Sequence, residues 1–457
     1  MHYNITTRHK NKILFVLFFS LCGYMIYAPM TSNYLINPDG ICMGLVYKRG
    51  SEGEELGRIG ISVVDALFGK VVSPNLMLVI SLCILALTVY LIIELFHVES
   101  FIDMVCLSAL ALLVPTTSST FTYYYCMISY ILAYFLSVFV CYFPVKMQKN
   151  WAFVIGSMFM AMQLSLYQAY LSVSIVIVLL YLCYLLVMDV ERSKILGMAF
   201  KFGGMGIFGV GLYLVLLKVM RIQLSNNRGF DKMGHIDVAS LPSLIRKAYR
   251  AFANYFLGDN FLNNSWLHRD LINVFTIAFL IGIFICLWLR KKMYRETWKN
   301  ILGGGIILLL PIATEIMVIA APGVDTYGST GILLIPGMVL MYMSVVLFHP
   351  LIVRCFQCKN DARHKIIRYA YLVVIFPLLW NLLCFTAAFE NVMWLNYHST
   401  YSLCERMGSQ IDKHMNKYEE IPKIMIGGNP EEGNYPCAYE ELRAVVNVNS
   451  LCNGLSD

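Results

Sequence analysis

The chain has 457 residues, of which 58% are hydrophobic and only 14% are charged, and its mean hydropathy is +0.65. Soluble globular domains are about 45–50% apolar and about 25% charged, so this composition excludes a water-soluble enzyme of this length. It also excludes a disordered chain, which is poor in large apolar side chains. The composition predicts a membrane protein, and the net charge of +7 reflects basic residues at helix ends rather than nucleic-acid binding.

The apolar segments predict an all-α polytopic bundle. A helix that crosses the hydrocarbon layer needs about 20 mostly apolar residues, because the layer is about 30 Å thick and each residue adds about 1.5 Å. The segments that meet or approach this length are 12–30, 76–96, 102–116, 120–143, 151–166, 167–188, 202–220, 271–289, 301–320, 331–349 and 369–389. We therefore expect about 11 transmembrane helices.

The basic residues set the expected orientation, because Lys and Arg gather on the cytoplasmic side of membrane helices. Short loops at 116–119 and 321–330 contain neither residue. The segments that carry them are 8–12, 144–150, 189–201, 290–300 and 350–368. This asymmetry predicts a multi-pass protein of the cytoplasmic membrane, with the N-terminus inside and the C-terminus outside.

Three long segments then lie outside the membrane: the loops 31–74 and 221–270 and the tail 391–457. In the tail, the stretch from NVMWLNYHST onwards favours a helix, and IPKIMIGG favours a strand and a turn. We therefore expect a membrane domain over 1–390, followed by a small extracytoplasmic α/β cap over 391–457.

The first outer loop begins with a turn that carries a carboxylate. In Asn37-Pro38-Asp39-Gly40, Pro fixes one φ angle and Gly permits a positive one. Asp39 would thus stand just beyond the first membrane helix, where it is available for chemistry. The structural alternative is an Asp39 side chain bonded to its own turn.

Residues 52–68 of the same loop fit a short helix on the membrane surface. Its apolar positions at helical spacing are Leu56, Ile59, Val63 and Leu67. The other face carries Arg58, Ser62 and Asp65. Arg58 is a candidate anion-binding residue, and its structural alternative is an ion pair with Glu54 along the helix.

The second outer loop contains LPSLIRKAYRAFANYFLG, which fits a basic amphipathic helix. Its apolar stripe consists of Leu244, Ala248, Phe252 and Phe256, and its basic residues are Arg246, Lys247 and Arg250. Such a helix can hold anionic lipid or a lipid-linked phosphate. The alternative is a solvated face of snorkelling side chains.

Other polar residues fall near the outer side. Glu315 interrupts an apolar run, so it must face protein or water, either in a ligand cavity or paired with a buried polar group. Asp325 follows in the next outer loop, and Tyr167 and Gln168 mark a helical hairpin where they contact a sugar or anchor the interface. These four residues are candidate substrate contacts.

The cysteines do not predict a metal site. Cys355 and Cys358 with His364 lack the four ligands of a zinc site. Cys437 and Cys452 lie in the tail, and the sequence leaves open whether they pair.

The order of these features resembles the bacterial glucosyl transferase family of O-antigen serotype conversion. The residues that carry the resemblance are Asn37-Pro38-Asp39-Gly40, Leu56-Gly57-Arg58-Ile59 and Leu166-Tyr167-Gln168-Ala169-Tyr170. The family has two adjacent acids where this chain has Pro38-Asp39. The alternative acids are therefore Glu52, Glu54, Glu55 and Asp65.

The resemblance implies a C-type membrane glycosyltransferase. Such an enzyme moves one hexose, here glucose, from a polyprenyl-phosphate carrier to a surface glycan outside the bacterial cytoplasmic membrane. It implies that Asp39 takes the proton of the acceptor hydroxyl and that Arg58 or the basic helix holds the donor phosphate. No cofactor is specified, and the need for a divalent cation stays open.

Two other functions are alternatives. A glycan polymerase or ligase would transfer oligosaccharides and need more outer arginines. A lipid-sugar flippase or transporter would show inverted repeats with matching broken helices, and the sequence shows none.

Overall fold

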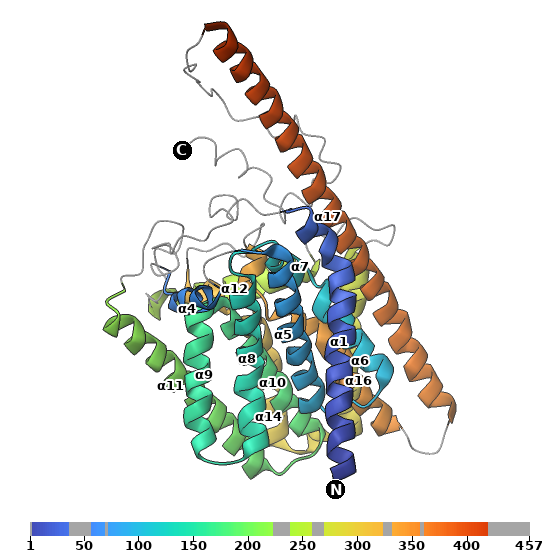
Figure 1. The fold of residues 1–457 in the computed structure, drawn as a ribbon. Helices are drawn as coiled ribbons and strands as arrows, with labels where there is room; N and C mark the ends of the chain where they lie inside the picture. Colours follow the sequence, from blue (N-terminus) through green and yellow to red (C-terminus); the bar gives the residue numbers. More distant parts are fainter. Residues whose placement is uncertain are drawn as a thin grey trace.

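A computed structural model of the chain shows a bundle of helices (Figure 1). It describes residues 2–35, 56–68, 72–222, 238–257, 269–322, 331–356 and 361–418. The main helices are α1 (His2–Ser32), α4 (Ile59–Leu67), α5 (Pro74–Leu95), α6 (Phe101–Leu113), α7 (Pro115–Thr120), α8 (Met127–Met147), α9 (Trp151–Leu166), α10 (Leu171–Val187), α11 (Arg192–Val219), α12 (Leu241–Leu257), α13 (Arg269–Arg290), α14 (Thr297–Thr314), α15 (Ile316–Ala320), α16 (Met338–Phe356) and α17 (Asp361–Tyr418). Short 3₁₀ turns are η1 (Gln168–Tyr170), η2 (Val238–Ser240), η3 (Met293–Arg295) and η4 (Gly331–Leu334). The described ranges contain no strand.

The helices identify a multi-pass membrane protein. Eight helical segments of the described chain are long and apolar enough to cross a membrane. Shorter apolar helices, α6, α9 and α16, occupy three more of the segments predicted from the sequence. The all-α class is therefore confirmed for these ranges, and the count of about 11 crossings stays a prediction.

Two membrane helices begin later than their apolar runs suggest. The run expected to start at residue 120 begins where the hydroxyl-rich helix α7 ends, and α8 follows only at Met127, after the turns at residues 121–126. The run expected to start at 331 opens with η4, and α16 begins at Met338 after Pro336 and Gly337. Before α16, Pro336 and Gly337 delay the regular helix.

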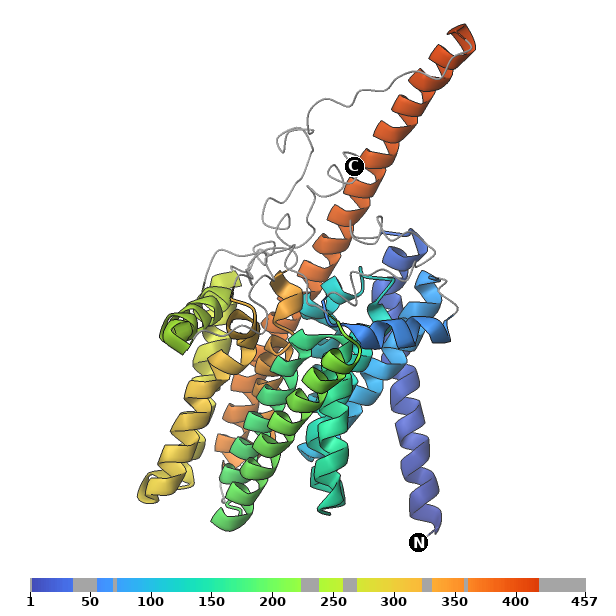
Figure 2. The same ribbon diagram turned by 90° about the vertical axis from the view of Figure 1, so that its left-hand side faces the viewer.

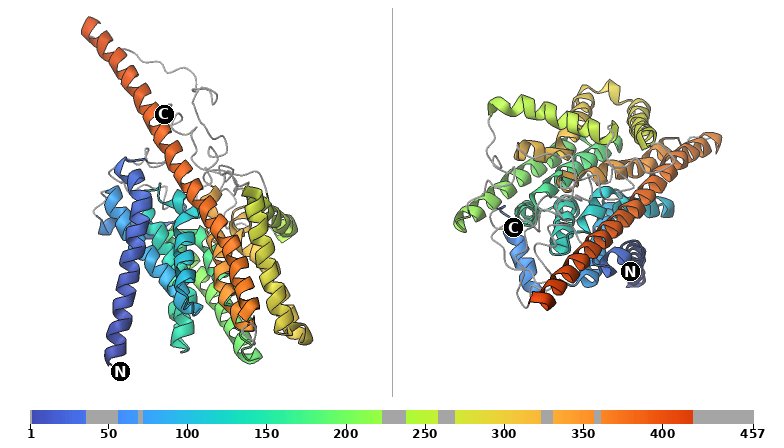
Figure 3. Two further views of the ribbon diagram at one scale, coloured as in Figure 1. Left: turned by 90° about the vertical axis from the view of Figure 1, so that its right-hand side faces the viewer. Right: turned by 90° about the horizontal axis from the view of Figure 1, so that it is seen from above.

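The last helix is much longer than a membrane crossing. α17 has 58 residues, about 87 Å at the usual helical rise, and its C-terminal part projects from the bundle (Figures 2 and 3). Residues 391–418, expected as a helix of a separate cap, continue the last membrane helix. The strand expected at 421–428 lies outside the described residues.

The core lies in the middle of the bundle. In the apolar stretch of η1 and α10, 78% of the residues are buried, whereas the corresponding figure for α1 is 22%. Helices at the edge expose large apolar side chains, for example Met25 of α1 and Phe200 and Ile207 of α11. Exposed apolar side chains around a buried apolar core are what contact with lipid requires.

Candidate functional site

Short elements gather at the end of the bundle opposite the N-terminus, called the distal end below. Here α4, α7 and α12 lie beside the ends of the long helices (Figures 1 and 2). α4 packs where α8 begins and α9 ends. Its exposed apolar residues, Val63 and Leu67, fit the predicted helix on the membrane surface, while its other side faces the bundle.

Two glycines allow α4 to pack closely. Gly57 has a φ of 73°, which non-glycine residues rarely adopt, and it turns the chain into the helix. A Cβ atom on Gly60 would lie 2.6 Å from the Ser165 hydroxyl oxygen, so a side chain there would push α4 off the end of α9. The chain between these glycines carries Arg58 inward.

Arg58 is held against two stacked tyrosine rings. Its guanidinium carbon lies 4.5 Å from the centre of the Tyr167 ring, and Nη1 donates to the Tyr130 hydroxyl over 3.3 Å. The two rings are 4.2 Å apart and nearly parallel, at 13°. Cation–π contact and one hydrogen bond thus orient the guanidinium group.

The charge of Arg58 is only partly compensated. Nε is buried and donates no hydrogen bond within the described chain, and none of the carboxylates in these ranges lies within ion-pair distance of the guanidinium group. A partly buried cation without a counter-charge is unfavourable, so the arrangement favours binding an anion. That Arg58 binds a phosphate stays a prediction.

Hydrogen bonds from Gln168 and Tyr213 hold the turn that precedes Arg58. The Gln168 amide nitrogen donates to the Leu56 carbonyl over 2.7 Å and to the Tyr213 hydroxyl over 2.8 Å. The Tyr213 hydroxyl in turn donates to the Gly57 carbonyl over 3.1 Å. Because both side chains are buried, these bonds fix the turn to η1 and α11. The structure therefore gives Gln168 a positioning role, and its contact with a sugar stays a prediction.

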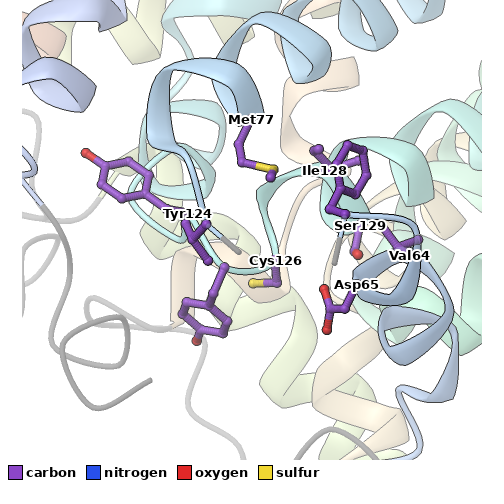
Figure 4. A pocket seen from close by; sticks show the side chains of 10 residues that line it. Val64, Asp65, Met77, Tyr124, Cys126, Ile128 and Ser129 are labelled. Carbon is purple, nitrogen blue, oxygen red and sulfur yellow. The ribbon is translucent and has the colours of Figure 1, made fainter. Parts of the chain in front are cut away.

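Asp65 points into a small cavity beside the start of α8. The cavity is about 20 Å³, enough for about one water molecule, and Asp65, Cys126 and Ser129 line it (Figure 4). Asp65 Oδ2 and the Ser129 hydroxyl are buried and have no hydrogen-bond partner among the described residues. Burial away from solvent raises the pKa of Asp65 to about 7. The carboxyl group therefore titrates near neutrality.

The structure brings the cation and this acid to the same side of α4. Arg58 and Asp65 are seven residues apart, which is about two helical turns or about 10 Å along the axis. Both side chains turn towards α8. The expectation that the two share the face opposite Val63 and Leu67 agrees with this arrangement.

The basic amphipathic helix forms at another part of the distal end. α12 buries Leu244, Ala248 and Phe256 and leaves Arg246, Lys247 and Arg250 exposed, as its pattern predicts. It packs on α13, α14 and α15, whereas α4 packs on α8 and α9. The structure therefore does not group its basic residues with Arg58 around one helix.

Glu315 stands at the break between α14 and α15, and it is 1% exposed. This burial agrees with the expectation that the carboxyl group faces protein rather than lipid. Asp39 and Asp325, and the alternative acids Glu52, Glu54 and Glu55, lie outside the described residues.

Sequence reasoning missed three residues of this site. Tyr130, Tyr213 and Ser129 lie in apolar helices, and nothing in their local pattern separates them from other tyrosines and serines. They became visible only when α8 and α11 were placed beside α4.

Metal-ligating side chains do not form a cluster in the described ranges. No group of three or more His, Cys, Asp or Glu side chains there lies close enough to hold a metal ion. Asp65 is the only carboxylate among the described residues that line the cavity at the start of α8, and one carboxylate does not make a divalent-cation site.

Fold and site together define a multi-pass membrane protein with an oriented arginine at the distal end of its bundle. The family model described as glucosyl transferase GtrII matches residues 28–348, more than half of the chain. The chain therefore belongs to this family, as the sequence resemblance predicted, and the protein is a glucosyltransferase. No curated protein and no solved structure matches it.

Proposed function

We propose that the protein moves a single glucose from a polyprenyl-phosphate carrier to a cell-surface glycan at the outer side of the cytoplasmic membrane. Family membership supports glucosyl transfer, and the many apolar helices support a donor that arrives within the bilayer. The observation that carries the donor assignment is Arg58, whose partly buried guanidinium group at the end of the bundle favours an anion. A phosphodiester at headgroup level is such an anion.

Arg58 acts on the leaving group in this proposal. The acceptor hydroxyl oxygen forms a bond to C1 of the glucose, the bond from C1 to the phosphate oxygen breaks, and polyprenyl phosphate leaves with the bonding electrons. Negative charge grows on the phosphate as this bond breaks. A preorganised guanidinium group stabilises that charge most strongly where water is excluded, and Arg58 lies against the buried ring of Tyr167.

A carboxylate of the first outer loop takes the acceptor proton. We propose Asp39 for this role, on the family resemblance and its place just beyond α1. Asp65 is the alternative within the described chain. In such a reaction the base and the phosphate-binding cation lie on opposite sides of C1 of the glucose. The hydrogen bonds and reacting bonds between them add up to about 10 Å. The spacing of Arg58 and Asp65 along α4 is of this size.

The remaining predicted contacts complete the proposal. Arg246, Lys247 and Arg250 attract anionic lipid to the distal end, while Tyr167, Glu315 and Asp325 contact the sugar or its acceptor. The predicted topology, with the N-terminus in the cytoplasm, turns the distal end outward, where a surface glycan is accessible.

The proposal is tested by mass spectrometry of surface glycans from bacteria with and without the gene. We expect the gene to add one hexose per repeating unit of the acceptor. A change in chain length without an added hexose would indicate a polymerase or ligase, and an unchanged glycan would contradict the proposal.

A further inference from the structure

A second polar cavity lies near the other end of the bundle, close to the end that holds the N-terminus. It forms where α6 begins, α16 ends and α17 begins, and its volume is about 300 Å³. This is within the size range of small-ligand sites. The glucosyl transfer site at α4 uses none of its residues.

The floor of this cavity is a pair of polar side chains, the buried Asp103 and the half-buried His349. His349 Nδ1 lies 3.2 Å from Asp103 Oδ1, and Asp103 is 2% exposed. The Tyr371 ring stacks on the His349 ring at 3.8 Å and 11°. The imidazole thus satisfies the carboxylate, while His349 Nε2 is buried with no hydrogen-bond partner among the described residues.

Two arginines stand on the rim. Arg354 of α16 pairs with Glu99 at 3.9 Å, and the Glu99 side chain is 83% exposed, so this ion pair is weak. Arg368 of α17 lies one turn before Tyr371 on the same face, and no carboxylate of the described chain lies within ion-pair distance of it. Both guanidinium groups therefore have bonding capacity left for a ligand.

We propose that this cavity binds the phosphate group of an anionic membrane phospholipid. Paired guanidinium groups match the geometry of phosphate oxygens. The volume is larger than a phosphate ion needs and leaves room for a glycerol headgroup. In the predicted topology this end faces the cytoplasm, where basic pockets between membrane helices hold anionic headgroups.

The surroundings favour a lipid over a soluble phosphate. Ile366, Tyr369 and Val373 of α17 flank Arg368 and are exposed, as are Phe101 and Ile102 at the start of α6. Apolar side chains at a membrane helix surface contact acyl chains. A headgroup in the cavity can therefore keep its tails in the bilayer.

Native mass spectrometry of the full-length protein tests the proposal. The protein is released from detergent with phosphatidylglycerol or with phosphatidylcholine of the same acyl chains. We expect one phosphatidylglycerol to stay bound at an occupancy at least about tenfold above phosphatidylcholine. The Arg354→Gln/Arg368→Gln variant should lose this preference.

The control is Arg192→Gln/Arg295→Gln, which removes two guanidinium groups that face Trp298 and Tyr294 outside the cavity. It should retain phosphatidylglycerol as the unchanged protein does. Equal lipid retention by the Arg354/Arg368 variant would overturn the proposal. So would stabilisation by inorganic phosphate without any lipid preference, which would indicate a soluble ligand. Single Arg368→Gln, at an exposed position, gives the same reading if the double variant fails to fold. The readout is independent of glucosyl transfer.

Discussion

Arg58 and Tyr167 form the contact on which the distal site is built, with the guanidinium carbon 4.5 Å from the ring centre. Tyr167 ends α9 and Arg58 precedes α4, so the contact joins the first outer loop to the hairpin of α9 and α10. Residues about 110 positions apart in the chain thus create one oriented cation.

Replacement of Arg58 should remove most of the transfer. Arg58→Gln deletes the charge that faces the leaving phosphate, and the loss of one such preorganised group costs about 10²–10³ in rate. Arg58→Lys keeps the charge but loses the planar fork and the ring contact, so we expect an intermediate rate. Arg221→Gln, an exposed arginine at the end of α11, is the control and should leave transfer unchanged. Activity of Arg58→Gln equal to this control would remove Arg58 from the mechanism.

Tyr213 should act through Arg58. Tyr213→Phe deletes the hydroxyl that joins Gln168 to the Gly57 carbonyl, and loosening the turn misplaces the guanidinium group. We expect a lower kcat with little change in melting temperature. The matched control is Tyr134→Phe, because the buried Tyr134 hydroxyl has no hydrogen-bond partner among the described residues.

A double-mutant cycle separates positioning from general destabilisation. If Tyr213 works through Arg58, Tyr213→Phe should have almost no further effect on transfer once Arg58 is Gln. Additive losses would show that Tyr213 supports the fold only. Transfer rates of the two single variants and the double variant, measured in membranes at equal protein content, decide between these outcomes.

Asp65 should make stability depend on pH. Its pKa is about 7 in the folded protein, whereas it is near 4 in an unfolded chain. Between these values the folded state keeps a proton that the unfolded state has lost, so stability falls as pH rises from about 4 to about 7. Melting curves across this range should show the fall, and Asp65→Asn should reduce it. An unchanged pH profile in Asp65→Asn would mean that Asp65 does not titrate in this range.

Replacement of each candidate base, Asp39 or Asp65, by asparagine distinguishes between the two. Asp39→Asn should abolish transfer without lowering expression, because an amide does not accept the acceptor proton. Asp65→Asn should then keep measurable transfer. The reverse result, with Asp39→Asn active and Asp65→Asn inactive, would assign the base to Asp65.

The sequence predicted the helices well because lipid imposes a length and an apolar composition on each one. It also predicted the two surface helices, since α4 and α12 show apolar residues on one side at helical spacing. It did not predict that α17 would run unbroken to Tyr418. The expected end of the membrane segment suggested a separate cap, but no proline or glycine stops the helix at that boundary. The family could be recognised from short motifs, such as Leu56-Gly57-Arg58.

The side chains that contact Arg58 could not be predicted from the sequence. Which tyrosine stacks on it depends on how α8 and α9 pack, and one tyrosine in an apolar helix looks like another. The burial of Asp65 likewise depends on the start of α8, and the sequence placed that start seven residues too early.

The most direct test of the central claim is sided transfer in membrane vesicles. The vesicles are loaded with polyprenyl-phosphate glucose, and the acceptor glycan is supplied on one side only. We predict that one glucose appears on the acceptor, with one polyprenyl phosphate released, only when the distal end faces that side, and that Arg58→Gln removes the product. Transfer to acceptor supplied at the N-terminal side, or full transfer by Arg58→Gln, would contradict the account.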